Sequence, residues 1–152
     1  MLAPGTSAPP FRLQDHNGQW VDLAALRGQR HVVLFFYPKD DTPGCTREAC
    51  GFRDAFADLQ AHDAVVVGVS GDDLASHRRF AERWHLPFHL VCDGDGALRR
   101  AYHVKRTLGL WPGRVTYVID KSGIIRSALN APFQPVRHVQ EALAALSDQR
   151  RV

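Results

Sequence analysis

The stretch HVVLFFYPKDDTPGCTREACG, residues 31–51, decides the fold of this 152-residue chain. Its first part, His31 to Tyr37, is continuously apolar after the histidine and rich in β-branched and aromatic residues, which is typical of a strand buried on both faces. A polar loop follows, and then a pattern that predicts a helix from about Pro43 to Gln60. The apolar positions of that pattern are three and four residues apart: Ala49, Phe52, Phe56 and Leu59.

The same alternation of strand and helix continues toward the C-terminus. Residues 64–70, AVVVGVS, are a second buried strand candidate, and Asp72 or Asp73 can begin a helix that runs to about Trp84. Beyond it we expect strands at 88–92, 114–120 and 124–130, the last two forming a hairpin, and a short helix at about 97–102. A final helix begins at Pro135, with one apolar face made of Val136, Val139, Leu143 and Leu146.

The N-terminal part predicts a separate hairpin. Residues 11–14 and 19–23 flank Asp15, His16, Asn17 and Gly18, and Asn-Gly between short alternating segments is a strong turn signal. The whole order predicts one α/β domain over residues 1–152, with three layers and a central mixed β-sheet flanked by helices. An antiparallel hairpin covered by a last helix is similar to the end of a thioredoxin-like sheet.

Composition and charge exclude several function classes. Hydrophobic residues make up 45% and charged residues 23%, as in ordinary globular proteins. The net charge of +3 comes from scattered arginines, so no nucleic-acid surface is expected. We find no signal peptide pattern and no membrane-spanning run, and therefore expect a cytoplasmic protein that does not bind membranes. In that reducing compartment, the three cysteines are core residues, metal ligands or redox-active thiols.

Cys45 has the position of a functional thiol. It lies within the first turn of the predicted helix, just after a buried strand, where open α/β sheets place their ligand sites. Free amides and the helix dipole there stabilise a thiolate, which is the nucleophilic form of cysteine. Thr42 can offer its hydroxyl to the sulfur, Pro38 stiffens the loop, and Gly44 lets a small ligand approach the backbone. A small core residue is the alternative, and the position after TPG favours the functional interpretation.

Cys50 follows Cys45 by five residues, which is an unusual spacing for a reactive pair. On an ideal helix their Cα atoms are about 8 to 9 Å apart, whereas a disulfide needs less than about 7 Å. If the two react together, the first turns of the helix must unwind. The spacing matches neither the C-x-x-C of thioredoxin-type reductases nor the cysteine pairs of structural zinc sites, so no metal is expected. It leaves open whether Cys50 is redox-active or a buried helical residue.

The segment FYPKDDTPGCTREACGFRD, residues 36–54, resembles the active-site segment of peroxiredoxins, and among them the Q-type, also called bacterioferritin comigratory proteins. Pro38, Thr42 and Cys45 match the P-x-x-x-T-x-x-C signature, and Cys50 matches the extra cysteine of the subgroup. The resemblance extends over most of the chain, including VVVGVSGDD, LPFHLVCDGDG and GRVTYVIDKSGII. The loop around Trp111 and the last stretch carry no such likeness.

The resemblance implies a thiol peroxidase that reduces hydrogen peroxide and organic hydroperoxides. The Cys45 thiolate would attack the peroxide and become a sulfenic acid. Thr42, Arg114 and the amides of Gly44 and Cys45 would orient the peroxide, and Pro38 would shield the sulfur. The family's glutamate, matched here by Glu48, would hold Arg114 in place.

The resemblance also implies how the enzyme is recycled. Cys50 would condense with the sulfenic acid in an atypical two-cysteine mechanism, and thioredoxin or a similar dithiol protein would reduce the intrachain disulfide. No cofactor is implied, and Q-type relatives suggest a monomer. Cys92 is either a half-buried core residue or, as in some relatives, a resolving cysteine far from the first helix. A rival function is a redox sensor that passes oxidation to a partner protein.

Overall fold

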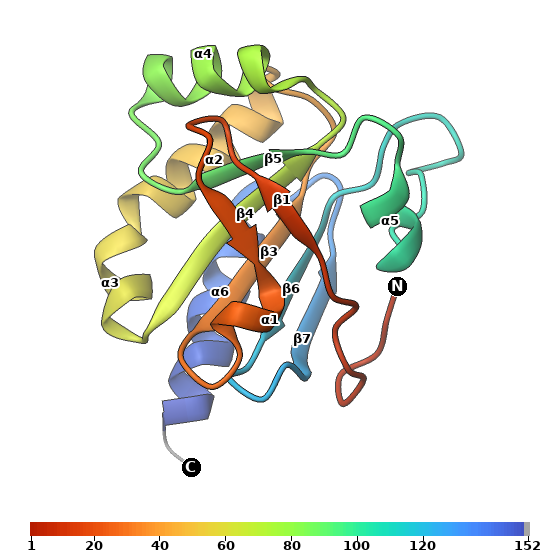
Figure 1. Cartoon of the computed structure of the whole chain (residues 1–152). Coiled ribbons are helices and arrows are strands. Elements are labelled where there is room, and N and C mark those ends of the chain that lie inside the picture. The colour runs from red at the N-terminus through yellow and green to blue at the C-terminus, as the bar shows by residue number, and fades with distance from the viewer. Residues whose placement is uncertain (151–152) are drawn as a thin grey trace.

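The computed structural model describes residues 1–150 and contains a two-stranded hairpin, a five-stranded sheet and six helices within them (Figure 1). The strands are β1 (Arg12–Gln14), β2 (Trp20–Asp22), β3 (His31–Phe36), β4 (Ala64–Ser70), β5 (His89–Cys92), β6 (Val115–Ile119) and β7 (Ile125–Asn130). The helices are α1 (Leu23–Leu26), α2 (Pro43–Asp54), α3 (Phe56–Ala61), α4 (Leu74–Trp84), α5 (Ala97–Ala101) and α6 (Pro135–Arg150).

The central sheet is mixed, with the strand order β5-β4-β3-β6-β7. β3 lies at its centre, parallel to β4 and antiparallel to β6, so that Val33 is in register with Val66 on one side and Val118 on the other. β5 is parallel to β4, and β7 is antiparallel to β6. The mixed sheet and the N-terminal hairpin predicted from the sequence are therefore confirmed.

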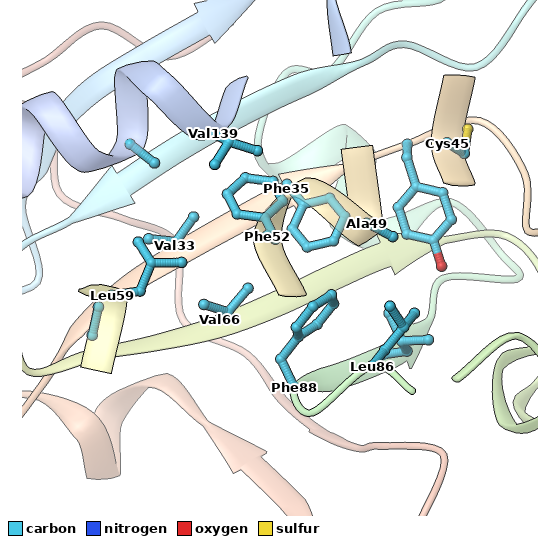
Figure 2. Close-up of a cluster of buried hydrophobic side chains, with 14 of the residues drawn as sticks. Val33, Phe35, Cys45, Ala49, Phe52, Leu59, Val66, Leu86, Phe88 and Val139 are labelled. Carbon is cyan, nitrogen blue, oxygen red and sulfur yellow. The ribbon is translucent and has the colours of Figure 1, made fainter. Parts of the chain in front are cut away.

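Two hydrophobic cores lie on the two faces of this sheet, because alternate residues of β3 point to opposite sides. Val33 and Phe35 face one core, which α2, α3, α4 and α6 cover, and Figure 2 shows part of it. Val32, Leu34 and Phe36 face the other core, which is covered by the N-terminal hairpin, α1 and the segment around α5. All five of these β3 residues are buried, which accounts for the unbroken apolar run in the sequence.

The structure corrects two details of the sequence prediction. The helix expected over 43–60 is two helices, α2 and α3, because Ala55 between them has φ −90° and ψ 1°. In α6, Val136 is 45% exposed and does not belong to the buried stripe. That stripe includes His138, Ala142 and Leu146, which are four residues apart and share one side of the helix.

Within residues 1–150, we find no helix that combines the length and the apolar character needed to cross a membrane.

Candidate active site

Cys45 lies in the first turn of α2, directly after the loop that leaves the central strand β3. Its side chain is 1% exposed and forms one end of the core cluster that α2 builds against the sheet. Figure 2 shows it on the same helix as Ala49 and Phe52, and the ring of Phe52 stacks on Phe35 with centroids 4.6 Å apart. The packing of α2 on the sheet therefore holds the sulfur at the carboxyl end of β3.

The start of α2 exposes backbone donors beside the sulfur. Pro43 is the first helical residue and Thr42 is the N-cap, but the Thr42 side chain forms no capping hydrogen bond. Its hydroxyl donates to the Lys39 carbonyl oxygen at 2.8 Å, so its proton does not point to the sulfur as the sequence suggested. The amides of Gly44 and Cys45 belong to the first turn, where N–H groups have no acceptor inside the helix.

Arg114 connects the sulfur to the rest of the sheet. It immediately precedes β6, and since Val115 pairs with Phe36 of β3, the antiparallel register brings it to the start of α2. Its Nη2 donates to Cys45 Sγ at 3.4 Å, and its Nε donates to the Pro132 carbonyl oxygen at 3.1 Å. The guanidinium is buried, and the structure thus brings Arg114 to Cys45 although the two residues are far apart in sequence.

Glu48 occupies the position one turn after Cys45 and completes the contacts of Arg114. Arg114 Nη1 donates to Glu48 Oε1 at 3.1 Å, as the resemblance implied. The Glu48 side chain is 0% exposed, and burial raises the pKa of its carboxyl to about 8, despite the opposing effect of Arg114. Among the described residues, its second oxygen, Oε2, has no hydrogen-bond partner.

Sequence reasoning missed a histidine behind this glutamate. The Nδ1 of His138, on α6, lies 3.6 Å from Glu48 Oε2 and 2.7 Å from Thr116 Oγ1, while its Nε2 lies 2.8 Å from the Ala131 carbonyl oxygen. Burial lowers the pKa of His138 to about 4. The only sequence signal was the helical spacing of His138 with Ala142 and Leu146, which would have marked the histidine as buried.

A cavity of about 460 Å³ opens beside the start of α2. Its lining includes the predicted site residues Pro38, Thr42, Gly44 and Arg114, and also the apolar residues Trp111, Pro112, Pro132 and Phe133. Gly44 is needed here because a Cβ atom on it would lie 3.1 Å from Arg114 Nη2. The cavity gives a small ligand access to the residues around Cys45.

The other two cysteines are free thiols and partly exposed. Cys50 is on α2 with Cys45, and burial raises the pKa of its thiol. Because α2 is a continuous helix over both positions, the pair keeps the separation that excludes a disulfide in this conformation. Cys92 ends β5, at the edge of the sheet away from Arg114.

Helix α4 holds both ends of the segment that carries Cys45 and Cys50. Before α2, Asp40 Oδ2 lies 2.7 Å from His77 Nδ1, and Asp41 Oδ1 accepts from Trp84 Nε1 at 3.1 Å. Toward the end of α2, Arg53 Nη1 donates to the Trp84 carbonyl oxygen at 2.8 Å. Trp84 therefore contacts residues on both sides of the two cysteines.

Comparison with known proteins decides the family. The model of the AhpC/TSA family matches residues 4–128, which is most of the chain. The chain belongs to the AhpC/TSA family. It is 44% identical over 146 residues to chloroplastic peroxiredoxin Q of Oryza sativa subsp. japonica, covering 95% of this chain and 67% of the relative. It is 46% identical over 143 residues to chloroplastic peroxiredoxin Q of Arabidopsis thaliana, covering 93% and 66%.

Solved structures give the same result for the fold. Peroxidoxin BcpB from Mycobacterium tuberculosis superimposes with a TM-score of 0.88 at 34% identity, covering 97% of this chain and 98% of that one. Peroxiredoxin Q of Xanthomonas campestris superimposes with a TM-score of 0.84 at 32% identity, covering 91% and 90%. The thioredoxin-like fold and the resemblance to Q-type peroxiredoxins are confirmed, and the chain is a peroxiredoxin peroxidase. Its location in the cell stays a prediction, and the plant relatives are chloroplastic.

Proposed function

We propose that this peroxiredoxin reduces peroxides at Cys45 and recycles the sulfur through Cys50. The observation that carries the proposal is the placement of Arg114 just before β6, the strand next to β3, from which it donates to Cys45 Sγ at 3.4 Å and to Glu48 at 3.1 Å. A fixed cation beside a buried sulfur stabilises the thiolate, and it also stabilises negative charge that develops on a peroxide oxygen.

The first step forms a sulfur–oxygen bond and breaks the oxygen–oxygen bond. The Cys45 thiolate attacks the terminal oxygen of ROOH, which gives the sulfenic acid of Cys45 and an alkoxide or hydroxide that takes up a proton. Arg114 and the amides of Gly44 and Cys45 hold the peroxide oxygens. Since the Thr42 hydroxyl donates its hydrogen bond to the backbone carbonyl oxygen of Lys39, its oxygen is left to accept a hydrogen bond from the hydroperoxide. Pro38 limits the access of water to the sulfur.

The second step needs a different conformation of α2. The thiol of Cys50 attacks the sulfenic sulfur and releases water, which leaves a Cys45–Cys50 disulfide within one chain. This bond requires unwinding of the first turns of α2, while the contacts of α4 with Asp40, Asp41 and Arg53 hold the ends of the segment. A dithiol protein then reduces the disulfide and becomes oxidised itself.

For the reductant we propose thioredoxin, acting on a monomeric enzyme in the cytoplasm. An intrachain disulfide supports a monomer, because no thiol from a second chain is needed. The peroxide substrates are hydrogen peroxide and organic hydroperoxides, and the apolar residues that line the cavity support the second class.

The experiment is peroxide-dependent NADPH consumption through thioredoxin reductase and thioredoxin. We expect turnover by the unmodified protein, none by Cys45→Ser, and none by Cys50→Ser. Cys92→Ser is the matched control and should turn over normally. Equal rates for the unmodified protein and Cys45→Ser would refute the peroxidase proposal, and loss of turnover in Cys92→Ser alone would transfer the resolving role to Cys92. Sustained turnover would also make a sensor function secondary.

A further inference from the structure

The buried carboxyl of Glu48 lies between Arg114, which stabilises a negative charge on it, and His138, which does not. On one side, Arg114 donates to Oε1 at 3.1 Å and favours the carboxylate. On the other side, Oε2 lies 3.6 Å from His138 Nδ1 and has no hydrogen-bond donor within residues 1–150. A charged oxygen that is buried without a donor is costly, so the surroundings of Oε2 favour the neutral carboxyl.

The hydrogen bonds of His138 determine which of its nitrogens carries a proton. Nε2 faces the carbonyl oxygen of Ala131 at 2.8 Å, and because a carbonyl can only accept, Nε2 carries the proton. Nδ1 then accepts from the Thr116 hydroxyl at 2.7 Å and has no proton to offer. Arg114 and Arg137 further disfavour a positive charge on this ring.

The charge of Glu48 matters because Arg114 is shared. Its guanidinium contacts both Glu48 and the sulfur of Cys45, at 3.1 and 3.4 Å, in a buried site. If Glu48 is ionised, the cation is already paired, and a thiolate would add a second negative charge. If Glu48 is neutral, the cation pairs with the thiolate alone.

We propose that His138 is a positioning residue for the peroxidase reaction. Because its Nδ1 accepts a hydrogen bond from Thr116, it donates none to Glu48 Oε2, and the Glu48 carboxyl stays neutral. The positive charge of Arg114 then pairs with the Cys45 thiolate alone. The proposal rests on the peroxidase function proposed above. It is supported by the raised pKa of Glu48, about 8, and the lowered pKa of His138, about 4, which make both groups neutral at physiological pH.

The test is the pH profile of a single-turnover reaction of Cys45 with hydrogen peroxide. In the unmodified protein we expect the second-order rate constant to fall above pH 8, as Glu48 ionises. His138→Gln places an amide donor near Oε2 and should move this fall to lower pH. A shift of one unit lowers the rate constant at pH 7.5 by about threefold. The exposed His103 provides the matched control, since His103→Gln should keep the original profile.

Two further variants separate this role from a merely structural one. Glu48→Gln cannot ionise, so its profile should not fall above pH 8, and adding His138→Gln should cause no further shift. Thr116→Val keeps the shape of the side chain, frees Nδ1 to take a proton, and should move the fall in the same direction as His138→Gln. The proposal is overturned if His138→Gln lowers the rate equally at every pH in both Glu48 backgrounds, or if neither His138→Gln nor Thr116→Val moves the profile. Normal peroxide reduction by Cys45→Ser would instead reject the peroxidase function itself.

Discussion

The buried charge state of Glu48 should be visible in the stability of the protein, without any measurement of activity. The pKa of Glu48 is raised from 4.5 to about 8 by burial, so between these values the folded protein binds a proton that the unfolded chain has lost. Stability must then fall as pH rises, by up to about 1.4 kcal/mol for each pH unit.

His138 has the opposite effect in a lower range of pH. Its pKa is lowered from 6.5 to about 4 by burial, so the unfolded chain binds the extra proton and stability rises with pH between these values. The two slopes oppose each other from about pH 4.5 to 6.5. From pH 6.5 to 8 the effect of Glu48 is larger than that of His138, and the Glu48 contribution to the free energy of unfolding should fall by up to about 2 kcal/mol.

The measurement is urea unfolding, followed by circular dichroism with all cysteines reduced, at half-unit steps from pH 6.5 to 8. The quantity to compare is the difference in unfolding free energy between the unmodified protein and Glu48→Gln, because the other titrating groups are common to both. Glu82→Gln, which changes an exposed carboxyl of α4, is the matched control and should follow the unmodified protein. Parallel curves for the unmodified protein and Glu48→Gln would mean that Glu48 is already ionised at pH 6.5, and the reasoning would be refuted.

Three other predictions follow from the site and its packing. Gly44→Ala puts a Cβ atom 3.1 Å from Arg114 Nη2, so the guanidinium must move, and the single-turnover rate with peroxide should fall by about tenfold or more, whereas Gly71→Ala, which meets only ordinary contacts, should not change it. With Trp20 and Trp111 replaced by Phe, the fluorescence emission of Trp84 should change when peroxide forms the disulfide, and it should stay constant in Cys50→Ser. The same emission change with and without Cys50 would contradict unwinding of the segment between Asp41 and Arg53, the two residues that Trp84 contacts. Phe52→Ala removes a fully buried ring stacked on Phe35 and should lower the free energy of unfolding by about 3 to 5 kcal/mol in urea titrations, and a loss below about 1 kcal/mol would show that the cavity collapses.

Local signals made the central strand and the start of α2 predictable. A short apolar run rich in β-branched and aromatic residues is typical of a strand covered on both faces, and Pro43 and Gly44 mark the point where the chain enters the helix and approaches a ligand. Cys45 could be placed in the first turn for the same reason. The prediction that the Thr42 hydroxyl points to the sulfur was wrong. The hydroxyl donates to the Lys39 carbonyl oxygen because the loop turns in that direction, and residue spacing does not encode such a turn.

Contacts between distant elements could not be predicted in this way. Arg114 was found through the family resemblance, and its contact with Cys45 follows from the register of β6 against β3. His138 and Thr116 were missed because their meeting depends on how α6 packs on β6, and neither residue stands in a recognisable motif. The break at Ala55 was also missed, since apolar spacing continues from α2 into α3.

The most direct test of the central claim is the identity of the disulfide formed by one equivalent of hydrogen peroxide. Trypsin separates the three cysteines into the peptides DDTPGCTR (residues 40–47), EACGFR (48–53) and WHLPFHLVCDGDGALR (84–99). Mass spectrometry of the alkylated, oxidised protein should find the first peptide linked to the second, and Cys92 alkylated as a free thiol. A link between the first and third peptides, with Cys50 free, would contradict the proposed unwinding and resolution at Cys50.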